Sequence, residues 1–221
     1  PIYLDLYLST VNAPLFEGQG LDQDEMLPDA HLFYAVALKN IAKTPEDSVM
    51  IEEHLKQAVD SKKNALPVYV ELMDLAKSRG QMDKWVKYCN EGKEKFPQEK
   101  AFPKLLIDHY QSARDYDSII KECDSYITNH PDDDFGYYWK ALSYYQKDNV
   151  KAALEWFEKT AEVNPESDDA WGGAGNSAWK LARDNQTNKA VSKPYYDKAI
   201  KYYEKVHELV PDDPDKWGYF L

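Results

Sequence analysis

The chain has 221 residues, 43% of them apolar, and a formal net charge of −12 at pH 7. A chain of this length and composition can bury a substantial core, which argues against disorder. Its acidity disfavours nucleic acid and anionic membrane surfaces as partners, and its arginines are limited to Arg79, Arg114 and Arg183. No apolar run approaches the roughly 18 residues that a transmembrane helix needs. We therefore expect a soluble protein that neither binds nucleic acid nor inserts into a membrane.

The first 28 residues lack the periodicity of the rest of the chain and are predicted to form an irregular N-terminal or capping segment. Residues 1–11 are apolar enough for a remnant helix or an extended capping strip, whereas residues 12–25 are polar and read as a long loop. No signal segment is visible. Because the first residue is Pro1 and not methionine, we expect the native start to lie outside this sequence, and we predict no compartment.

From residue 29 onward, apolar residues recur at helical spacing in blocks of about a dozen, separated by short polar turns. Gly80 and Asp148-Asn149 are typical of helix ends, and Thr44 followed by Pro45 is typical of a helix start. The pattern predicts ten antiparallel helices and no sheet, with the helices paired at residues 29–42 and 46–62, 66–79 and 82–95, 100–113 and 116–129, 134–147 and 149–163, and 168–184 and 193–210.

The helix pairs repeat along the chain. Pro97, Pro131 and Pro165 follow one another at intervals of 34 residues, and each closes one pair. A single pair cannot bury its apolar face, so each pair is expected to stack on its neighbours. The units are predicted at about residues 32–65, 66–99, 100–133, 134–167 and 168–213, with the start of a further helix at 214–221.

Two units carry related residues at matching positions. In the fourth unit these are Tyr137, Lys140, Ala141, Tyr144, Ala153, Phe157 and Pro165. In the fifth unit they are Trp171, Ala174, Gly175, Ala178, Ala199, Tyr203 and Pro211. This pattern resembles the tetratricopeptide repeat, in which W-x2-L-G-x2-Y is followed by A-x3-F and a proline. The resemblance implies an all-α fold, a right-handed solenoid of about five antiparallel helix pairs with a concave groove.

Several positions depart from the family pattern. Lys140 stands where the family favours leucine, and Trp85 stands where it favours alanine. Gly92, two helical turns after Trp85, is expected to make room for the indole. The fifth unit exceeds the 34-residue period by 12 residues, and the polar residues 184–188 predict a loop near 183–193.

No motif for catalysis or for a cofactor is present. The five histidines are scattered and form no zinc motif, and Cys89 and Cys123 lack the spacing of a disulfide framework or a metal site. We expect both cysteines to be reduced and buried. Asp74 and Asp108 are the one candidate pair of groove carboxylates, and no nucleophile accompanies them. We therefore predict no enzyme, no cofactor, and no catalytic or metal-binding residue.

In tetratricopeptide proteins the first helix of each unit lines the groove, and the resemblance transfers two sets of residues. The N-terminal set is mixed and charged: Val36, Asn40, Val70, Asp74, Lys104 and Asp108. The C-terminal set is largely aromatic: Phe135, Tyr138, Leu142, Tyr145, Gly172, Asn176 and Trp179. The first set lacks the lysine and asparagine pairs that clamp the terminal carboxylate of chaperone tails, so we do not expect chaperone-tail binding. The second set is the candidate partner-binding site, because aromatic residues dominate binding hot spots.

Two functions are compatible with these features. The first is a protein-interaction scaffold that holds a segment of another protein in the groove. The second is a non-catalytic spacer within a larger protein or complex that continues beyond Leu221. Tyr138, Tyr145 and Trp179 suit either ligand contact or helix packing, and the sequence does not choose between them. It also identifies neither the partner nor an oligomeric state.

Overall fold

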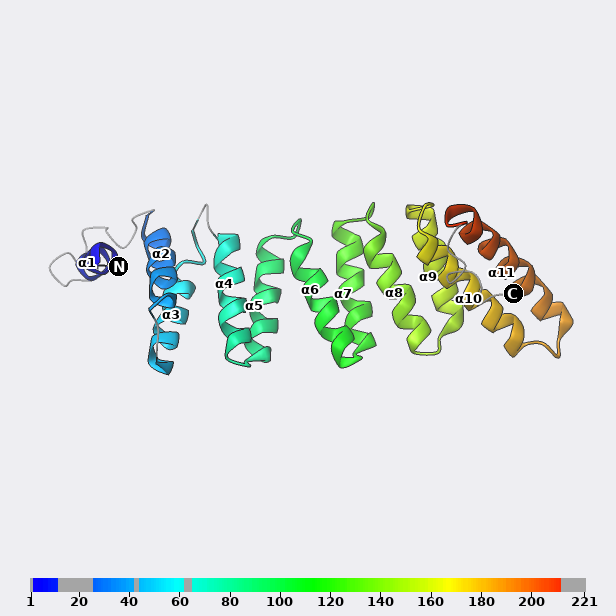
Figure 1. Ribbon diagram of the computed structural model, residues 1–221, viewed down its shortest axis with the longest axis horizontal. Coiled ribbons are helices and arrows are strands. Elements are labelled where there is room, and N and C mark those ends of the chain that lie inside the picture. The colour runs from blue at the N-terminus through cyan, green and yellow to red at the C-terminus, as the bar shows by residue number, and fades with distance from the viewer. Residues whose placement is uncertain (1, 12–25, 42–43, 62–64, 212–221) are drawn as a thin grey trace. The chain divides into compact units, whose positions relative to one another are not determined.

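The computed structural model describes residues 2–11, 26–41, 44–61 and 65–211, which form eleven helices and no strand (Figure 1). The helices are α1 (Ile2–Val11), α2 (Leu27–Lys39), α3 (Pro45–Gln57), α4 (Ala65–Ser78), α5 (Met82–Lys95), α6 (Ala101–Ala113), α7 (Tyr116–Asn129), α8 (Asp134–Gln146), α9 (Val150–Val163), α10 (Asp168–Asp184) and α11 (Lys189–Leu209). The all-α prediction is confirmed. The expected loop at 12–25 and the expected further helix at 214–221 lie outside the described residues.

The chain divides into two compact units, residues 1–102 and 103–221. In the first unit α1 packs on α2, α2 on α3, α3 on α4, and α4 on α5. Apolar side chains at helical spacing fill the space between these helices, because each helix turns one apolar stripe inward. Among the most deeply buried are Ala35, Leu55, Ala58, Val68, Leu72, Cys89 and Phe102. The N-terminal segment is thus helical over Ile2–Val11, which corresponds to the remnant helix among the two forms expected for it.

In the second unit α7 packs on α8, α8 on α9, α9 on α10, and α10 on α11. One core cluster joins Ile107, Ile119 and Cys123. A larger one is built on small residues, which let the helices approach closely: Ala141, Ala153, Leu154, Phe157, Ala174, Ala178, Ala199 and Tyr202. Since α8 and α10 also touch, α9 and α11 lie behind them as a second layer. This arrangement positions the candidate site.

The turn between the two helices of a pair has the same backbone form in three places. Gly80, Arg114 and Asp148 have positive φ angles of 66°, 55° and 61°. They stand 34 residues apart, so the left-handed residue that ends a helix recurs with the repeat period. Two of the three are not glycine, which explains why composition alone indicated only part of this series.

The turn between successive pairs is equally regular. The residue before each closing proline has φ between −126° and −136° and ψ between 64° and 89°, as at Phe96, His130, Asn164 and Val210. A residue that precedes proline is pushed out of the α region, which ends the helix there. Tyr137 then donates a hydrogen bond to the Pro131 carbonyl at 3.2 Å, and Trp171 donates its indole N–H to the Pro165 carbonyl at 2.8 Å.

The additional residues of the fifth unit lengthen helices and do not form the loop predicted near 183–193. α10 has 17 residues and α11 has 21, whereas α4 to α9 have 13 or 14. Residues 185–188 alone separate α10 from α11. Pro194, which we expected in the first turn of the last helix, lies inside α11. The polar run did mark a turn, but the helix pattern resumes directly after it at Lys189.

Two departures from the repeat pattern are accommodated by packing. The Lys140 side chain is buried where leucine was expected, and its ammonium group lies 3.7 Å from the centre of the Trp156 ring and pairs with Asp124. Its stem thus fills an apolar position while its charge finds partners. The space beside Gly92 is taken by Phe102 and not by Trp85: a Cβ on Gly92 would come within 2.6 Å of the Phe102 ring. The pairing expected for Gly92 was therefore wrong.

Both cysteines are free thiols, and both are fully buried. The Cys89 thiol contacts the Phe102 carbonyl at 3.3 Å. Burial, together with the charge of Glu122, raises the pKa of Cys123 to about 12. Neither thiol is therefore suited to act as a nucleophile near neutral pH.

Candidate partner-binding pocket

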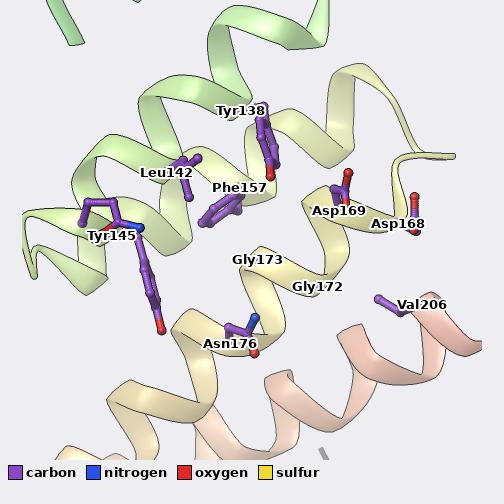
Figure 2. A pocket seen from close by; sticks show the side chains of 11 residues that line it. Tyr138, Leu142, Tyr145, Phe157, Asp168, Asp169, Gly172, Gly173, Asn176 and Val206 are labelled. Carbon is purple, nitrogen blue, oxygen red and sulfur yellow. The ribbon is translucent and has the colours of Figure 1, made fainter. Parts of the chain in front are cut away.

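A pocket of about 290 Å³ opens between α8 and α10 of the second unit, and the Phe157 side chain of α9 reaches into it from behind (Figure 2). We call it the α8–α10 pocket. It is lined by Tyr138, Leu142, Tyr145, Gln146, Phe157, Asp168, Asp169, Gly172, Gly173, Asn176 and Val206. Helical geometry explains why α8 contributes Tyr138, Leu142 and Tyr145, because residues three and four apart lie on one face.

The floor of the pocket is apolar. The rings of Tyr138 and Phe157 meet edge to face, with 5.9 Å between their centroids. Gly173 lies directly under Phe157, since a Cβ at this position would be 2.4 Å from the ring. Leu142 packs on the same core cluster. The missing side chain at Gly173 therefore allows the phenyl ring to lie flat enough to form a floor between the two helices.

Gly172 keeps the pocket open. A Cβ built on this residue would have no heavy atom within 4 Å, in contrast to its neighbour Gly173. Gly172 is in the interior of α10, where glycine is about 1 kcal/mol less favourable than alanine. The residue that costs helix stability thus coincides with the open volume of the pocket.

Asn176 supplies a hydrogen-bonding group to the pocket. The hydroxyl of Tyr203 donates to the Asn176 Oδ1 atom at 3.0 Å. Burial and the nearby Tyr145 raise the pKa of Tyr203, so this hydroxyl keeps its proton throughout the physiological range. With Oδ1 engaged, the amide nitrogen of Asn176 is turned toward the pocket (Figure 2). It is therefore placed to donate to a carbonyl of a bound molecule.

The end of the pocket where α10 begins is acidic. Asp168 and Asp169 occupy the first turn of α10, after the cap made by Ser167, whose hydroxyl accepts from the Ala170 N–H at 3.2 Å. Tyr145 lies at the opposite end (Figure 2). None of the lining residues is a lysine, arginine or histidine. The pocket is therefore apolar at its floor and negative at one end.

Five of the seven residues predicted for the site line this pocket, namely Tyr138, Leu142, Tyr145, Gly172 and Asn176. The other two lie elsewhere. Phe135 packs on Tyr126 at 5.3 Å and carries the Lys104 ammonium 4.6 Å from its ring centre. Trp179 is 44% exposed beyond the end of the pocket, where the Arg183 guanidinium lies 4.6 Å from its ring centre.

Sequence reasoning missed the residues that come from outside the first helix of a unit or from its first turn. Phe157 belongs to a second helix and was assigned to packing as part of the A-x3-F motif. Asp168 and Asp169 read as ordinary acids at a helix start, which they also are. The signal for the floor was the pair Gly172-Gly173, since two adjacent glycines inside a helix indicate a close approach on one side.

Among the described residues, no group of three histidine, cysteine or acidic side chains could hold a metal ion. A search of the same residues finds no helix long and apolar enough to cross a membrane.

Comparison with known proteins identifies the repeat. A profile of the tetratricopeptide repeat matches residues 136–167, which span α8, α9 and the closing proline. The chain is a tetratricopeptide repeat protein. The matched repeat contains the α8 and α9 portions of the pocket. None of the curated proteins is similar enough in sequence to this tetratricopeptide repeat protein to count as a relative.

Solved structures of MamA share the fold. A crystal structure of MamA has a TM-score of 0.53 at 15% identity and covers 89% of this chain and 97% of its own. MamA of AMB-1 has a TM-score of 0.53 at 12% identity, with 90% and 100% covered. The MamA fragment from residue 41 to the end, from Desulfovibrio magneticus RS-1, has a TM-score of 0.50 at 14% identity, with 85% and 96% covered. At these identities the similarity concerns the fold, a helical repeat solenoid of the tetratricopeptide type.

Proposed function

We propose that this tetratricopeptide repeat protein is a non-catalytic scaffold that holds a segment of a partner protein at the α8–α10 pocket. The family supports a protein-interaction role in general. The observation that carries the specific proposal is the open volume over Gly172, enclosed by Tyr138, Tyr145 and Asn176. A pocket with an aromatic lining and a few polar groups is the usual form of a recognition site.

The size of the pocket favours a side chain of a protein over a free small molecule. Pockets for small ligands usually measure about 300–1,000 Å³, and this one, at about 290 Å³, lies at the lower limit. It has room for one or two side chains. The amide of Asn176 can then pair with the backbone beside an inserted side chain, as it is turned toward the same space.

The residues around the pocket support binding without chemistry. Its ionisable lining residues are two tyrosines and two aspartates, and none of them forms a hydrogen bond to a serine, cysteine or histidine that the structure records. A nucleophile next to a base is the usual sign of covalent catalysis. The proposal therefore assigns a binding role to these side chains and no reaction.

Site-specific photocrosslinking tests this proposal. Benzoylphenylalanine is introduced at Gly172 and, as a matched control, at Glu155, an exposed residue of α9 that does not line the pocket. Both proteins are irradiated in an extract of the native cells, and crosslinked peptides are sequenced. We expect position 172 to give one dominant crosslinked segment that position 155 does not give. The same segments at both positions, or none at position 172, would contradict the proposal.

A further inference from the structure

We propose that the side chain held by the α8–α10 pocket is a lysine or an arginine of the partner segment. This inference rests on the proposed function and adds the chemistry of the anchor. It follows from the presence, in one small pocket, of an aromatic floor and two carboxylates with no compensating cation in the lining.

The shape of the pocket suits a long side chain with a charged tip. Tyr138 on α8 and Asp169 on α10 lie on the two sides of the gap between these helices, and Phe157 lies below it (Figure 2). The methylene stem of a lysine or arginine would lie over Phe157 and Leu142. Its charged tip would then reach the acidic end and the face of the Tyr138 ring. Such side chains bury their stems on apolar surfaces and place their charge against carboxylates or aromatic rings.

The charges around the pocket favour the same occupant. Asp168 and Asp169 are part-buried and exposed, respectively, and both border the open volume. Lys180, the nearest cation to the aromatic wall, lies 5.7 Å from the Tyr145 ring centre and is paired with Asp148. The N-terminal end of α10 offsets only about half a unit charge, less than the two carboxylates carry. The net field at this end therefore attracts a cation.

Other occupants fit less well. An acidic side chain or a terminal carboxylate would be repelled by Asp168 and Asp169. A purely apolar side chain would fit over Phe157, but it would remove water from the two carboxylates without replacing their hydrogen bonds, which is costly. Only a basic side chain satisfies both the floor and the acidic end.

Selection from a random dodecapeptide phage library tests the inference, because the protein itself chooses the anchor. The library is selected on the wild-type protein and counter-selected on Gly172→Phe, in which the new side chain fills the pocket. The best peptides are resynthesised with the anchor lysine replaced by norleucine, which keeps the stem and removes the charge. Each peptide is also measured on the Asp168→Asn, Asp169→Asn double variant, after circular dichroism has shown that the variants are folded.

We expect pocket-dependent peptides with a lysine or arginine at one fixed position. Norleucine at that position, and the double variant, should each weaken binding about tenfold or more, and added salt should weaken it further. Pocket-dependent peptides with an apolar or acidic anchor would overturn the basic anchor and leave the proposed function standing. If no selected peptide depended on the open pocket, the proposed function and the basic anchor would both be overturned.

Discussion

The ring of Phe157 lies against the Cα atom of Gly173, so that a Cβ on this glycine would be 2.4 Å from the Phe157 Cε1 atom. The adjacent Gly172 has no heavy atom within 4 Å of the same position. Two neighbouring glycines in one helix thus have opposite surroundings. One allows α9 to reach through to the pocket, and the other leaves the pocket open.

The two glycines should respond differently to substitution by alanine. Gly173→Ala should lower the free energy of unfolding by about 1–3 kcal/mol, because the new methyl group displaces a buried ring. Gly172→Ala should raise it by about 0.5–1 kcal/mol, because alanine favours the helix and meets open space. Urea unfolding followed by circular dichroism measures both values. Changes of the same sign in the two variants would show that the packing described for Phe157 is wrong.

Glu52 holds the helices of the first unit together and should make the stability of that unit sensitive to acid. Its carboxylate is 7% exposed and accepts hydrogen bonds from Arg79 at 2.8 Å, Lys84 at 2.8 Å and Tyr88 at 2.7 Å. Burial alone would raise the pKa of Glu52, but hydrogen bonds from Lys84, Lys56 and Tyr88 outweigh it and lower the pKa to about 2.

Because the folded pKa lies below the ordinary value of 4.5, the stability that Glu52 contributes is fully present above pH 4.5 and is lost as the pH falls toward 2. Glu52→Gln should cost about 2 kcal/mol at pH 7, since it leaves the cations around it without their anion. It should also remove that part of the acid dependence. Unfolding curves of both proteins between pH 6 and pH 2 provide the measurement, and parallel pH dependences would contradict the role of Glu52.

A histidine pair in the same unit should act over a higher pH range. The Nδ1 atoms of His31 and His54 lie 2.8 Å apart, and Tyr34 stacks on His54 with 4.6 Å between ring centroids. Burial, followed by the charge of His54, lowers the pKa of His31 from 6.5 to about 4. Burial also lowers the pKa of His54, although Glu53 and Asp5 oppose this shift.

The histidine with a lowered pKa is stabilising above pH 6.5 in its neutral form, and its contribution is lost as the pH falls from 6.5 toward 4. His31→Gln should therefore flatten the pH dependence of stability between these values and leave the lower range, which belongs to Glu52, unchanged. Thermal unfolding at half-unit steps of pH distinguishes the two ranges. A wild-type midpoint that does not change between pH 7 and pH 4 would rule out the buried neutral pair.

The repeat was predictable from the sequence because the residues that define it act locally. A residue before proline leaves the α region wherever it stands, so Pro97, Pro131 and Pro165 mark helix ends without knowledge of the fold. The helix pairs follow from apolar periodicity, which needs only the spacing of side chains. The predicted helices agree with the observed ones within a few residues, apart from the ends of α3 and the start of α11.

The remaining features depend on contacts between helices, which spacing does not record. Gly92 makes room for Phe102 of the following helix, whereas the sequence suggested Trp85 of its own helix. Phe157 crosses from the second layer into the pocket because Gly173 allows it. Phe135 and Trp179 share the spacing of the pocket residues, but Phe135 is drawn into packing around Tyr126 and Trp179 lies past the end of the pocket.

The affinity of the crosslinked partner segment for two single variants tests the binding role of the α8–α10 pocket most directly. Gly172→Phe fills the pocket from a position with open space around it, and Glu155→Phe places the same side chain on the exposed face of α9. Isothermal titration calorimetry with the purified segment should show binding at least about tenfold weaker for Gly172→Phe and within about twofold of wild type for Glu155→Phe. Wild-type affinity in the folded Gly172→Phe protein would contradict a binding role for this pocket.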